Sequence, residues 1–158
     1  MTAARALMLA SLAVLLGCAT EKSAAAPAPK TYDVPLTTAA EVPVCAAAGQ
    51  GATVNAKIAI APDDSSITTT VTYSGLSGDV TVAHIHVGAA GVAGPVVLPF
   101  SAPLTSPFTK TFTAADYVAA PNAPPDFPSF LVLLKSGGAY LNVHTAACKP
   151  GEIRGQIQ

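Results

Sequence analysis

The segment TVNAKIAIAPDDSSITTTVTYSG, residues 53 to 75, decides the fold class. Apolar side chains recur at every second position from Val54 to Ile60 and again, with Thr69 as the exception, from Ile67 to Tyr73. Successive side chains of a β-strand point to opposite faces, so this period predicts two strands that each bury one face. The polar turn PDDS between them joins the two strands into a β-hairpin.

Short runs of the same kind fill the rest of the chain and alternate with turn residues. We expect further strands at residues 79 to 88, 96 to 100, 108 to 113, 139 to 145 and 151 to 157. The second and third of these are expected to pair with each other. About seven short strands with frequent turns predict an all-β fold, an antiparallel β-sandwich.

One or two short helices are expected beside the strands. The run SFLVLLKSGG, residues 129 to 138, begins with a good N-cap in Ser129 and stops at Gly137, which predicts one buried helix. A buried strand is the alternative, because an apolar run of this length fits both. The tetrapeptide TAAD, residues 113 to 116, has the capping-box pattern that opens a helical turn.

The composition excludes several classes of function. The chain has 158 residues, which is enough for one domain with its own core. It is 51% hydrophobic and 11% charged, with 8 basic and 9 acidic side chains and no basic cluster, so nucleic acid is not an expected partner. The sequence contains no Gly-x-Ser-x-Gly motif and no phosphate-binding glycine loop, so it indicates no common hydrolase or nucleotide chemistry.

The N-terminus has the pattern of an export signal. Residues 1 to 17 carry one positive charge at Arg5, followed by an apolar run that is too short to span a bilayer. The sequence LLGC that ends this run resembles the bacterial lipobox, which implies cleavage before Cys18 and lipidation of that cysteine. An ordinary signal peptide with a chance cysteine is the alternative. Because Ala19 follows the cysteine, the lipoprotein pattern favours the outer membrane of a bacterial envelope, facing the periplasm or the exterior.

The next segment separates this anchor from the folded part. Residues 18 to 30 have no apolar periodicity and contain two prolines, which predicts a flexible tether ahead of a domain over residues 31 to 158. Two cysteines remain beyond the tether, Cys45 and Cys148. In an exported, oxidising setting they are expected to form a disulfide. A thiolate metal site is the alternative.

The segment AHIHVG contains two of the three histidines of the chain. Side chains at positions i and i+2 of a strand share a face, so His84 and His86 stand side by side. The alternate set, which begins with Ala83 and Ile85, is small and aliphatic and forms the better core face. The two imidazoles, with Val80 on the same face, are therefore expected to point away from the core.

The last two strands carry polar side chains in the same arrangement. Leu141, Val143, Ile153 and Ile157 are expected to face the core. The polar side chains on the opposite face are, in sequence order, Tyr140, Asn142, His144, Glu152, Arg154 and Gln156.

Three segments together resemble one known family. They are LTTAAEVPV (36 to 44), AHIHVGAAGVAGPVV (83 to 97) and YLNVHTAACKPGEIRGQI (140 to 157), of which the last is the most specific. Residues 32 to 158 resemble the CHRD domain, which is named after chordin and is common in secreted bacterial proteins. The resemblance implies an immunoglobulin-like or superoxide-dismutase-like sandwich in an extracytoplasmic protein. It implies no settled biochemical activity.

All three histidines lie in the motifs that match this family. The His-x-His pair falls on His84 and His86, and the Asn-x-His-Thr motif falls on Asn142, His144 and Thr145. Three converging imidazoles would bind zinc or copper through nitrogen and leave one coordination position open. This site requires the strand of the His-x-His pair to lie within about one strand spacing of the strand of the third histidine.

A weaker resemblance points to copper–zinc superoxide dismutases. These enzymes also carry a His-x-His pair at a strand end of a disulfide-bonded β-sandwich, and His84 and His86 match that pair. The chain has only three histidines and no His/Asp-rich loop to hold zinc. A copper-dependent redox enzyme is therefore the least favoured extension.

The alternative is that the same residues bind no metal and only stabilise the fold. The histidines then bond to Asn142, Thr145, Glu152 or backbone carbonyls, while Glu152 and Arg154 form a surface ion pair of about 0 to 1 kcal/mol. On these grounds the sequence indicates a lipid-anchored binding or interaction module rather than an enzyme. Its partner lies in the envelope or outside the cell. A copper- or zinc-binding protein is the competing hypothesis.

Overall fold

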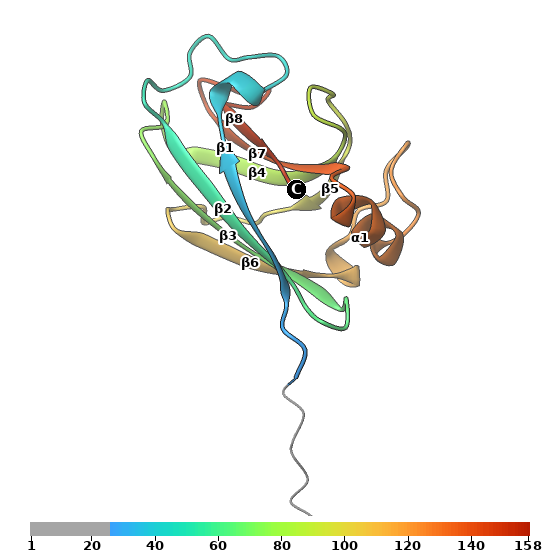
Figure 1. Cartoon of the computed structure of the whole chain (residues 1–158). Coiled ribbons are helices and arrows are strands. Elements are labelled where there is room, and N and C mark those ends of the chain that lie inside the picture. The colour runs from blue at the N-terminus through green and yellow to red at the C-terminus, as the bar shows by residue number, and fades with distance from the viewer. Residues whose placement is uncertain (1–25) are drawn as a thin grey trace, which may run out of the picture.

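The computed structural model of the chain describes residues 26–158. The predicted signal peptide, Cys18 and the first part of the predicted tether lie outside these residues. In Figure 1 the chain enters its first strand at the lower end of the molecule, whereas the connection from the first to the second strand lies at the upper end. Within the described part, no helix has the length and hydropathy needed to cross a membrane.

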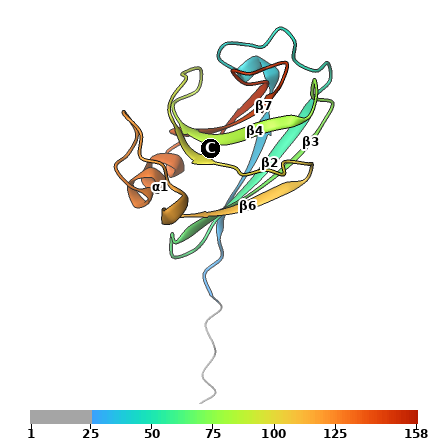
Figure 2. The ribbon, with the colours of Figure 1, turned by 180° about the vertical axis from the view of Figure 1, so that it is seen from behind.

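Eight strands form two antiparallel sheets of four strands each, which face each other (Figures 1 and 2). Sheet A has the order β1 (Lys30–Leu36), β2 (Thr53–Ile60), β3 (Ser66–Ser74) and β6 (Phe108–Thr113). Sheet B has the order β5 (Val96–Pro99), β4 (Val80–Val87), β7 (Ala139–Thr145) and β8 (Ile153–Gln156). The predicted β-sandwich is confirmed.

The alternating side chains of the hairpin build one wall of the core. β2 and β3 pair as predicted, with Ala56 opposite Val71 and Ile60 opposite Ile67. These four side chains are almost completely buried. The core faces predicted for sheet B are confirmed as well, since Ala83, Ile85, Leu141, Val143, Ile153 and Ile157 all belong to the same core.

Two details of the strand prediction are wrong. Residues 96 to 100 and 108 to 113 do not pair with each other, because β5 pairs with β4 in sheet B and β6 pairs with β3 in sheet A. The connection between them crosses the sandwich and buries Leu104, and alternation alone cannot reveal such a crossing. Val80 packs against the core rather than away from it, because the register shifts between Val80 and Val82.

The predicted helix is confirmed, but its start is different. α1 (Phe127–Lys135) has Asp126 as its N-cap, and the Asp126 side chain accepts a hydrogen bond from the Ser129 backbone N–H. The helix therefore begins ahead of Ser129, because the first turn tolerates the proline there. It ends at Lys135, and Gly137, which follows the C-cap Ser136, has a φ of 82° that suits the end of a helix. The capping box of residues 113 to 116 opens a short 3-10 helix, η2 (Ala114–Asp116), as predicted.

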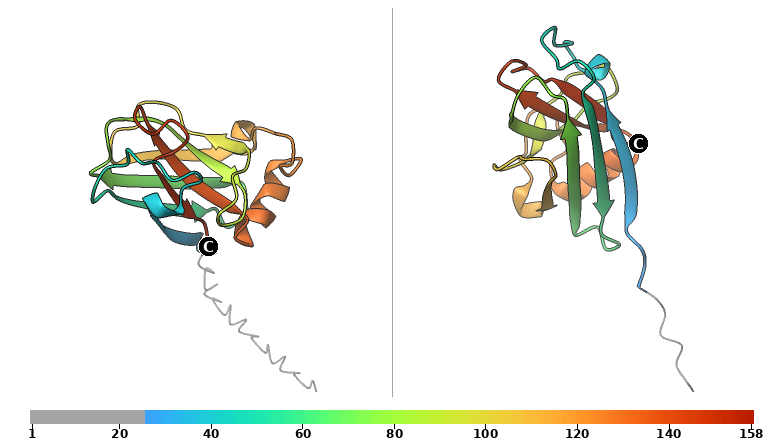
Figure 3. Two further views of the ribbon diagram at one scale, coloured as in Figure 1. Left: turned by 90° about the horizontal axis from the view of Figure 1, so that it is seen from above. Right: turned by 90° about the vertical axis from the view of Figure 1, so that its left-hand side faces the viewer.

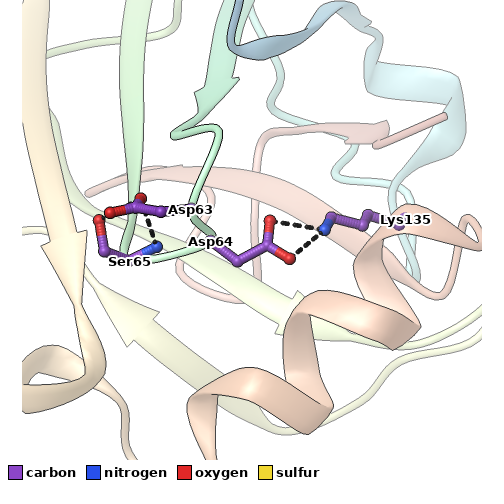
Figure 4. A network of polar contacts seen from close by, with 4 residues as sticks. All are labelled: Asp63, Asp64, Ser65 and Lys135. Carbon is purple, nitrogen blue, oxygen red and sulfur yellow. Dashed lines mark hydrogen bonds and ion pairs between the residues drawn. The ribbon is translucent and has the colours of Figure 1, made fainter. Parts of the chain in front are cut away.

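The helix α1 closes one end of the sandwich (Figure 1). Its last residue, Lys135, pairs with Asp64 in the β2–β3 turn at 2.6 Å (Figure 4). The neighbouring Asp63 accepts hydrogen bonds from Ser65 and so orders the same turn. A further 3-10 helix, η1 (Thr38–Ala40), follows β1 near the end of the molecule that carries the β1–β2 connection (Figure 3).

Candidate metal centre

The outer face of sheet B, the face turned away from sheet A, holds the candidate side chains that alternate with the core residues, Asn142 and His144 on β7 and Arg154 on β8. The predicted orientation is confirmed, because the alternate residues of β4, β7 and β8 fill the core. This outer face is nevertheless not a solvent-exposed surface. All seven residues of β7 are buried. The buried polar side chains of sheet B and the segment before β8 are His86, Asn142, His144, Thr145, Glu152 and Arg154.

Three connecting segments cover this face. The loop over residues 88 to 95 is held to β7 by the Gly94 backbone N–H, which donates to the Tyr140 hydroxyl at 3.1 Å. The segment over residues 41 to 51 is held by buried carboxylates, and the loop over residues 146 to 151 closes back onto β7. Side chains that alternation assigns to the polar face are therefore shielded from water by backbone.

The three histidines converge, as the proposed metal site requires. β4 and β7 are neighbouring strands, with Val82 opposite His144 and His84 opposite Asn142. The His84 Nδ1 atom lies 3.2 Å from the His144 Nε2 atom. One ring nitrogen from each of the three histidines lies within 4.8 Å of the others. We call His84, His86 and His144 the histidine cluster.

Backbone carbonyls fix two of the three imidazoles. The His86 Nδ1 atom lies 2.9 Å from the Gly94 carbonyl oxygen, and the His144 Nδ1 atom lies 2.8 Å from the Lys149 carbonyl oxygen. A carbonyl can only accept, so each Nδ1 carries the proton. In the neutral rings both Nε2 atoms then present a lone pair. Metal-binding histidines are usually held by the same kind of contact on their second nitrogen.

One of these lone pairs has no partner. The Nε2 atom of His86 is buried and makes no hydrogen bond with the described residues. The ring is held in place by Tyr140, on which it stacks at 4.7 Å with an angle of 9° between the planes. A buried polar atom without a partner costs about 1–3 kcal/mol. This cost indicates that a ligand or an ordered water completes the site.

Two members of the cluster have a lowered pKa. Burial, followed by the neighbouring His144 and His86, lowers the pKa of His84 to about 4. Burial also lowers the pKa of His86, although the hydrogen bond to Gly94 opposes the shift. Protons therefore compete weakly for these lone pairs, and a neutral imidazole is the form that binds a metal.

The distances suit a tetrahedral nitrogen site. Two nitrogens bound to one ion at about 2.0–2.1 Å lie about 3.3 Å apart at a tetrahedral angle. The separation of 3.2 Å between His84 and His144 is close to this value. Separations of up to 4.8 Å to the third histidine require a small side-chain movement. A set of three imidazoles suits zinc or copper, whereas magnesium and calcium prefer oxygen ligands.

Glu152 has a different role from the predicted one. Its carboxylate accepts hydrogen bonds from the Gly49 and Ser77 backbone N–H groups at 2.8 and 2.7 Å, and from the Thr145 hydroxyl at 2.6 Å. Burial raises the pKa of Glu152, but the hydrogen bonds from Ser77, Thr145 and Gly49 outweigh it and leave the pKa below its usual value. Glu152 is therefore a buried anchor for two connections.

Arg154 does not pair with Glu152, and the predicted surface ion pair is wrong. The guanidinium carbon of Arg154 lies 3.4 Å from the centre of the Tyr140 ring, and its Nη2 atom donates to the Ala89 carbonyl oxygen at 2.8 Å. Both side chains are buried because the loops cover this face. Within residues 26–158 the ion pairs are Lys110–Asp116 and Lys135–Asp64.

Glu41 and Gly94 escaped the sequence reasoning, and Tyr140 was placed on this face without a role. Glu41 is buried, and its Oε2 atom accepts a hydrogen bond from the Asn142 side-chain amide. Gly94 and Tyr140 hold His86. The Glu-Val-Pro motif and the glycine-rich loop lie in the segments that carried the family resemblance, and this is the only sequence signal for them. Contacts over 101 residues of separation leave no local pattern.

The predicted disulfide between Cys45 and Cys148 is confirmed, with a Cα–Cα distance of 5.8 Å. The alternative of a thiolate metal site is therefore wrong. The bond connects the segment over residues 41 to 51 with the loop over residues 146 to 151. Cys148 is fully buried, and its neighbour Lys149 supplies the carbonyl that holds His144.

Fold and site together define a class: a disulfide-bonded, antiparallel β-sandwich that carries a three-histidine cluster under the loops of one sheet. The family comparison agrees with it. The model of the CHRD domain matches residues 32–157, and the chain therefore belongs to the CHRD-domain family. No curated protein and no solved structure matches the chain. Membership in this family supports a role as a binding or interaction module.

Proposed function

We propose that this CHRD-domain protein binds a copper or zinc ion through the histidine cluster while a lipid on Cys18 holds it at the outside of a bacterial membrane. The observation that carries the metal proposal is the buried Nε2 lone pair of His86, which has no partner among residues 26–158. A flip of the ring would keep the Tyr140 stack but break the Gly94 hydrogen bond.

A purely structural network leaves this lone pair unexplained. The His144 Nδ1 proton is bound to Lys149, so the His144 Nε2 atom must accept and the His84 Nδ1 atom must donate in the short contact between them. That contact satisfies two of the three histidines. His86 faces the same place with an acceptor and receives nothing. An ion satisfies all three nitrogens, once the His84 ring proton moves from Nδ1 to Nε2.

Copper is the metal that the donor set favours on affinity. At nitrogen sites the affinity for divalent copper exceeds the affinity for zinc. Three protein nitrogens leave the fourth position of a tetrahedral ion open to water or to a small ligand. This chain's residues would hold the ion, set the tautomers of His86 and His144, and keep the cluster partly shielded from bulk water.

The location rests on the sequence and on the disulfide. The lipobox-like LLGC segment supports lipidation of Cys18. The Cys45–Cys148 bond suits an oxidising compartment outside the cytoplasm. In a bacterium that expresses the chain, membrane fractionation should find the protein with the membranes and should find a Cys18→Ser variant in the soluble or unprocessed fraction. Equal membrane association of both chains would contradict the lipid anchor.

Direct metal titration tests the metal proposal. The full chain, purified in detergent and stripped with a chelator, is titrated with zinc or copper against a chromophoric competitor. We expect one ion per chain, and a loss of at least about 10-fold in affinity for His86→Gln. Lys149→Ala is the matched control, because it removes an exposed side chain but keeps the carbonyl that holds His144. No stoichiometric ion in the parent chain, or equal binding by His86→Gln, would overturn the metal site.

A further inference from the structure

We propose that the redox state of the Cys45–Cys148 bond sets the affinity of the histidine cluster for its metal. The regulation of metal binding rests on the proposed function. The underlying mechanical link, from the disulfide to the orientation of His144, can be measured without any metal.

The link runs through two adjacent residues. Cys148 is fully buried and bonded to Cys45 in the segment over residues 41 to 51. The next residue, Lys149, directs its carbonyl onto the His144 Nδ1 atom at 2.8 Å. This contact fixes the tautomer and the ring angle of His144, and so aims its Nε2 lone pair at the cluster. The disulfide therefore fixes Cys148, and the next residue, Lys149, carries the carbonyl that orients His144.

Reduction would loosen this link without unfolding the domain. The segment over residues 41 to 51 keeps two other attachments, from Glu41 to Asn142 and from Gly49 to Glu152. The loop over residues 146 to 151 keeps the bond from the Cys148 N–H to the Thr145 carbonyl. What disappears is the covalent constraint on the turn that carries Lys149. The expected result is a more mobile Lys149 carbonyl on an intact sandwich.

The contacts that hold His86 do not include this constraint, and His84 meets it only through its contact with His144. His86 is held by Gly94, in the loop between β4 and β5, and by Tyr140 in β7. The disulfide joins neither of these segments. His84 lies in the middle of β4. The effect is therefore directed at His144, and His86 serves as an internal reference on the same molecule.

The chemistry is a two-electron exchange with a dithiol. Cys45 is the more exposed of the two cysteines, so a thiolate of the reductant attacks the Cys45 sulfur. The bond to Cys148 breaks, Cys148 leaves as a thiolate and takes up a proton, and a mixed disulfide forms. The second thiol of the reductant attacks that bond and releases Cys45 as a thiol. Both electrons come from the dithiol, which ends as its own disulfide.

Proton exchange at the imidazoles tests the mechanical link. In the metal-free full chain, nuclear magnetic resonance follows exchange of the Nδ1 protons of His144 and His86 with solvent, in the oxidised chain and in a Cys45→Ser/Cys148→Ser variant. We expect His144 exchange to accelerate at least about 10-fold while His86 exchange changes less than about twofold. Equal changes at both rings, or none at His144, would overturn the link.

Metal affinity tests the regulation. The same two chains are titrated with zinc. The variant lacks both cysteine side chains of the domain, and we expect it to bind about 10-fold more weakly, as for the loss of an orienting partner. Ile67→Ala in sheet A is the control for general loss of stability, and its affinity should stay within about twofold of the parent chain. Equal affinity of the oxidised chain and the cysteine variant overturns the regulation, whereas absence of binding in the oxidised chain overturns the proposed function instead.

Linkage provides a second measurement on the unmodified sequence, which keeps the test valid if the cysteine variant does not fold. If the disulfide tightens zinc binding about 10-fold, zinc binding must favour the disulfide over the dithiol by the same factor. In glutathione buffers with free zinc held constant, the midpoint potential should fall by about 30 mV when zinc saturates the site. An unchanged midpoint would overturn the coupling.

Discussion

The outer faces of the two sheets carry polar residues at the same strand spacing but use them in opposite ways. On sheet A, threonines of neighbouring strands bond to each other in the open, as in Thr68–Thr111 and Thr70–Thr109, both at 2.9 Å. On sheet B, loops cover the polar face and bury a carboxylate, a guanidinium and two histidines. A polar alternation in the sequence therefore predicts the face, but the connections decide whether that face meets water or builds a site.

The largest difference between the faces should come from Glu152. We expect Glu152→Ala to lower the free energy of unfolding by about 3–5 kcal/mol, because it removes a buried carboxylate and leaves the Gly49 and Ser77 N–H groups without a partner. The matched change on sheet A is Lys57→Ala, with an expected loss within about 0.5 kcal/mol. Urea denaturation of both variants measures the two values. Similar losses would show that burial does not distinguish the two faces.

The next effect is a pH dependence that belongs to sheet B alone. The pKa of His84 is about 4 in the folded chain against 6.5 for an ordinary histidine. The unfolded chain therefore binds the proton first as the pH falls, so stability is constant above pH 6.5, decreases between pH 6.5 and 4, and levels off below. His84 is only half-buried, so we discount the shift to about 1–2 kcal/mol.

Denaturation of the metal-free chain at pH 7 and pH 5 measures this dependence. His84→Gln should reduce the slope, and the part that remains belongs to His86, whose pKa is also lowered by burial. A threonine variant of sheet A, Thr70→Val, should keep the slope of the parent chain. If His84→Gln keeps that slope as well, His84 is not the group responsible.

A smaller loss is expected at Tyr140. Tyr140→Phe keeps the ring that stacks between Arg154 and His86 but removes the hydroxyl that accepts from Gly94. We expect about 1 kcal/mol of destabilisation. Metal affinity should fall several-fold, because the Gly94 carbonyl that orients His86 becomes less fixed. Calorimetric unfolding and the metal titration above provide the two readings. An unchanged affinity would show that the loop holds Gly94 without the hydroxyl.

The sequence predicted the parts of the molecule that depend on local periodicity. The hairpin over residues 53 to 75 and the core side chains of sheet B follow from alternation. The family motifs placed all three histidines among the candidates, but their convergence depends on β4 and β7 being neighbours, which the sequence did not establish. The covering of sheet B does not follow from alternation either, because the glycine-rich loop over residues 88 to 95 has no period. The contact from Glu41 to Asn142 joins residues that are 101 positions apart, and it depends on the closed fold.

The same distinction explains the errors. Glu152 and Arg154 were predicted at the surface because they alternate with Ile153, and this orientation is right. Their exposure was wrong, since exposure depends on segments that are distant in the sequence. The pairing of β5 and β6 failed for a related reason. An alternating run shows which side chains face the core, but either sheet can supply its partner strand.

The smallest effect is expected on the open face of sheet A, where the double change Thr68→Val/Thr111→Val replaces a bonded pair by two apolar side chains of similar shape. Both hydroxyls bond only to each other and lie at the surface, so their removal leaves no buried group unsatisfied. Valine also has a high strand propensity. We expect the free energy of unfolding to stay within about 0.5 kcal/mol of the parent value, and metal affinity to stay unchanged. Urea denaturation measures the first quantity. A loss above about 2 kcal/mol would mean that the threonine pairs stabilise sheet A about as strongly as the buried network stabilises sheet B. The two faces would then differ in the kind of side chain they use and not in their contribution to the free energy of unfolding.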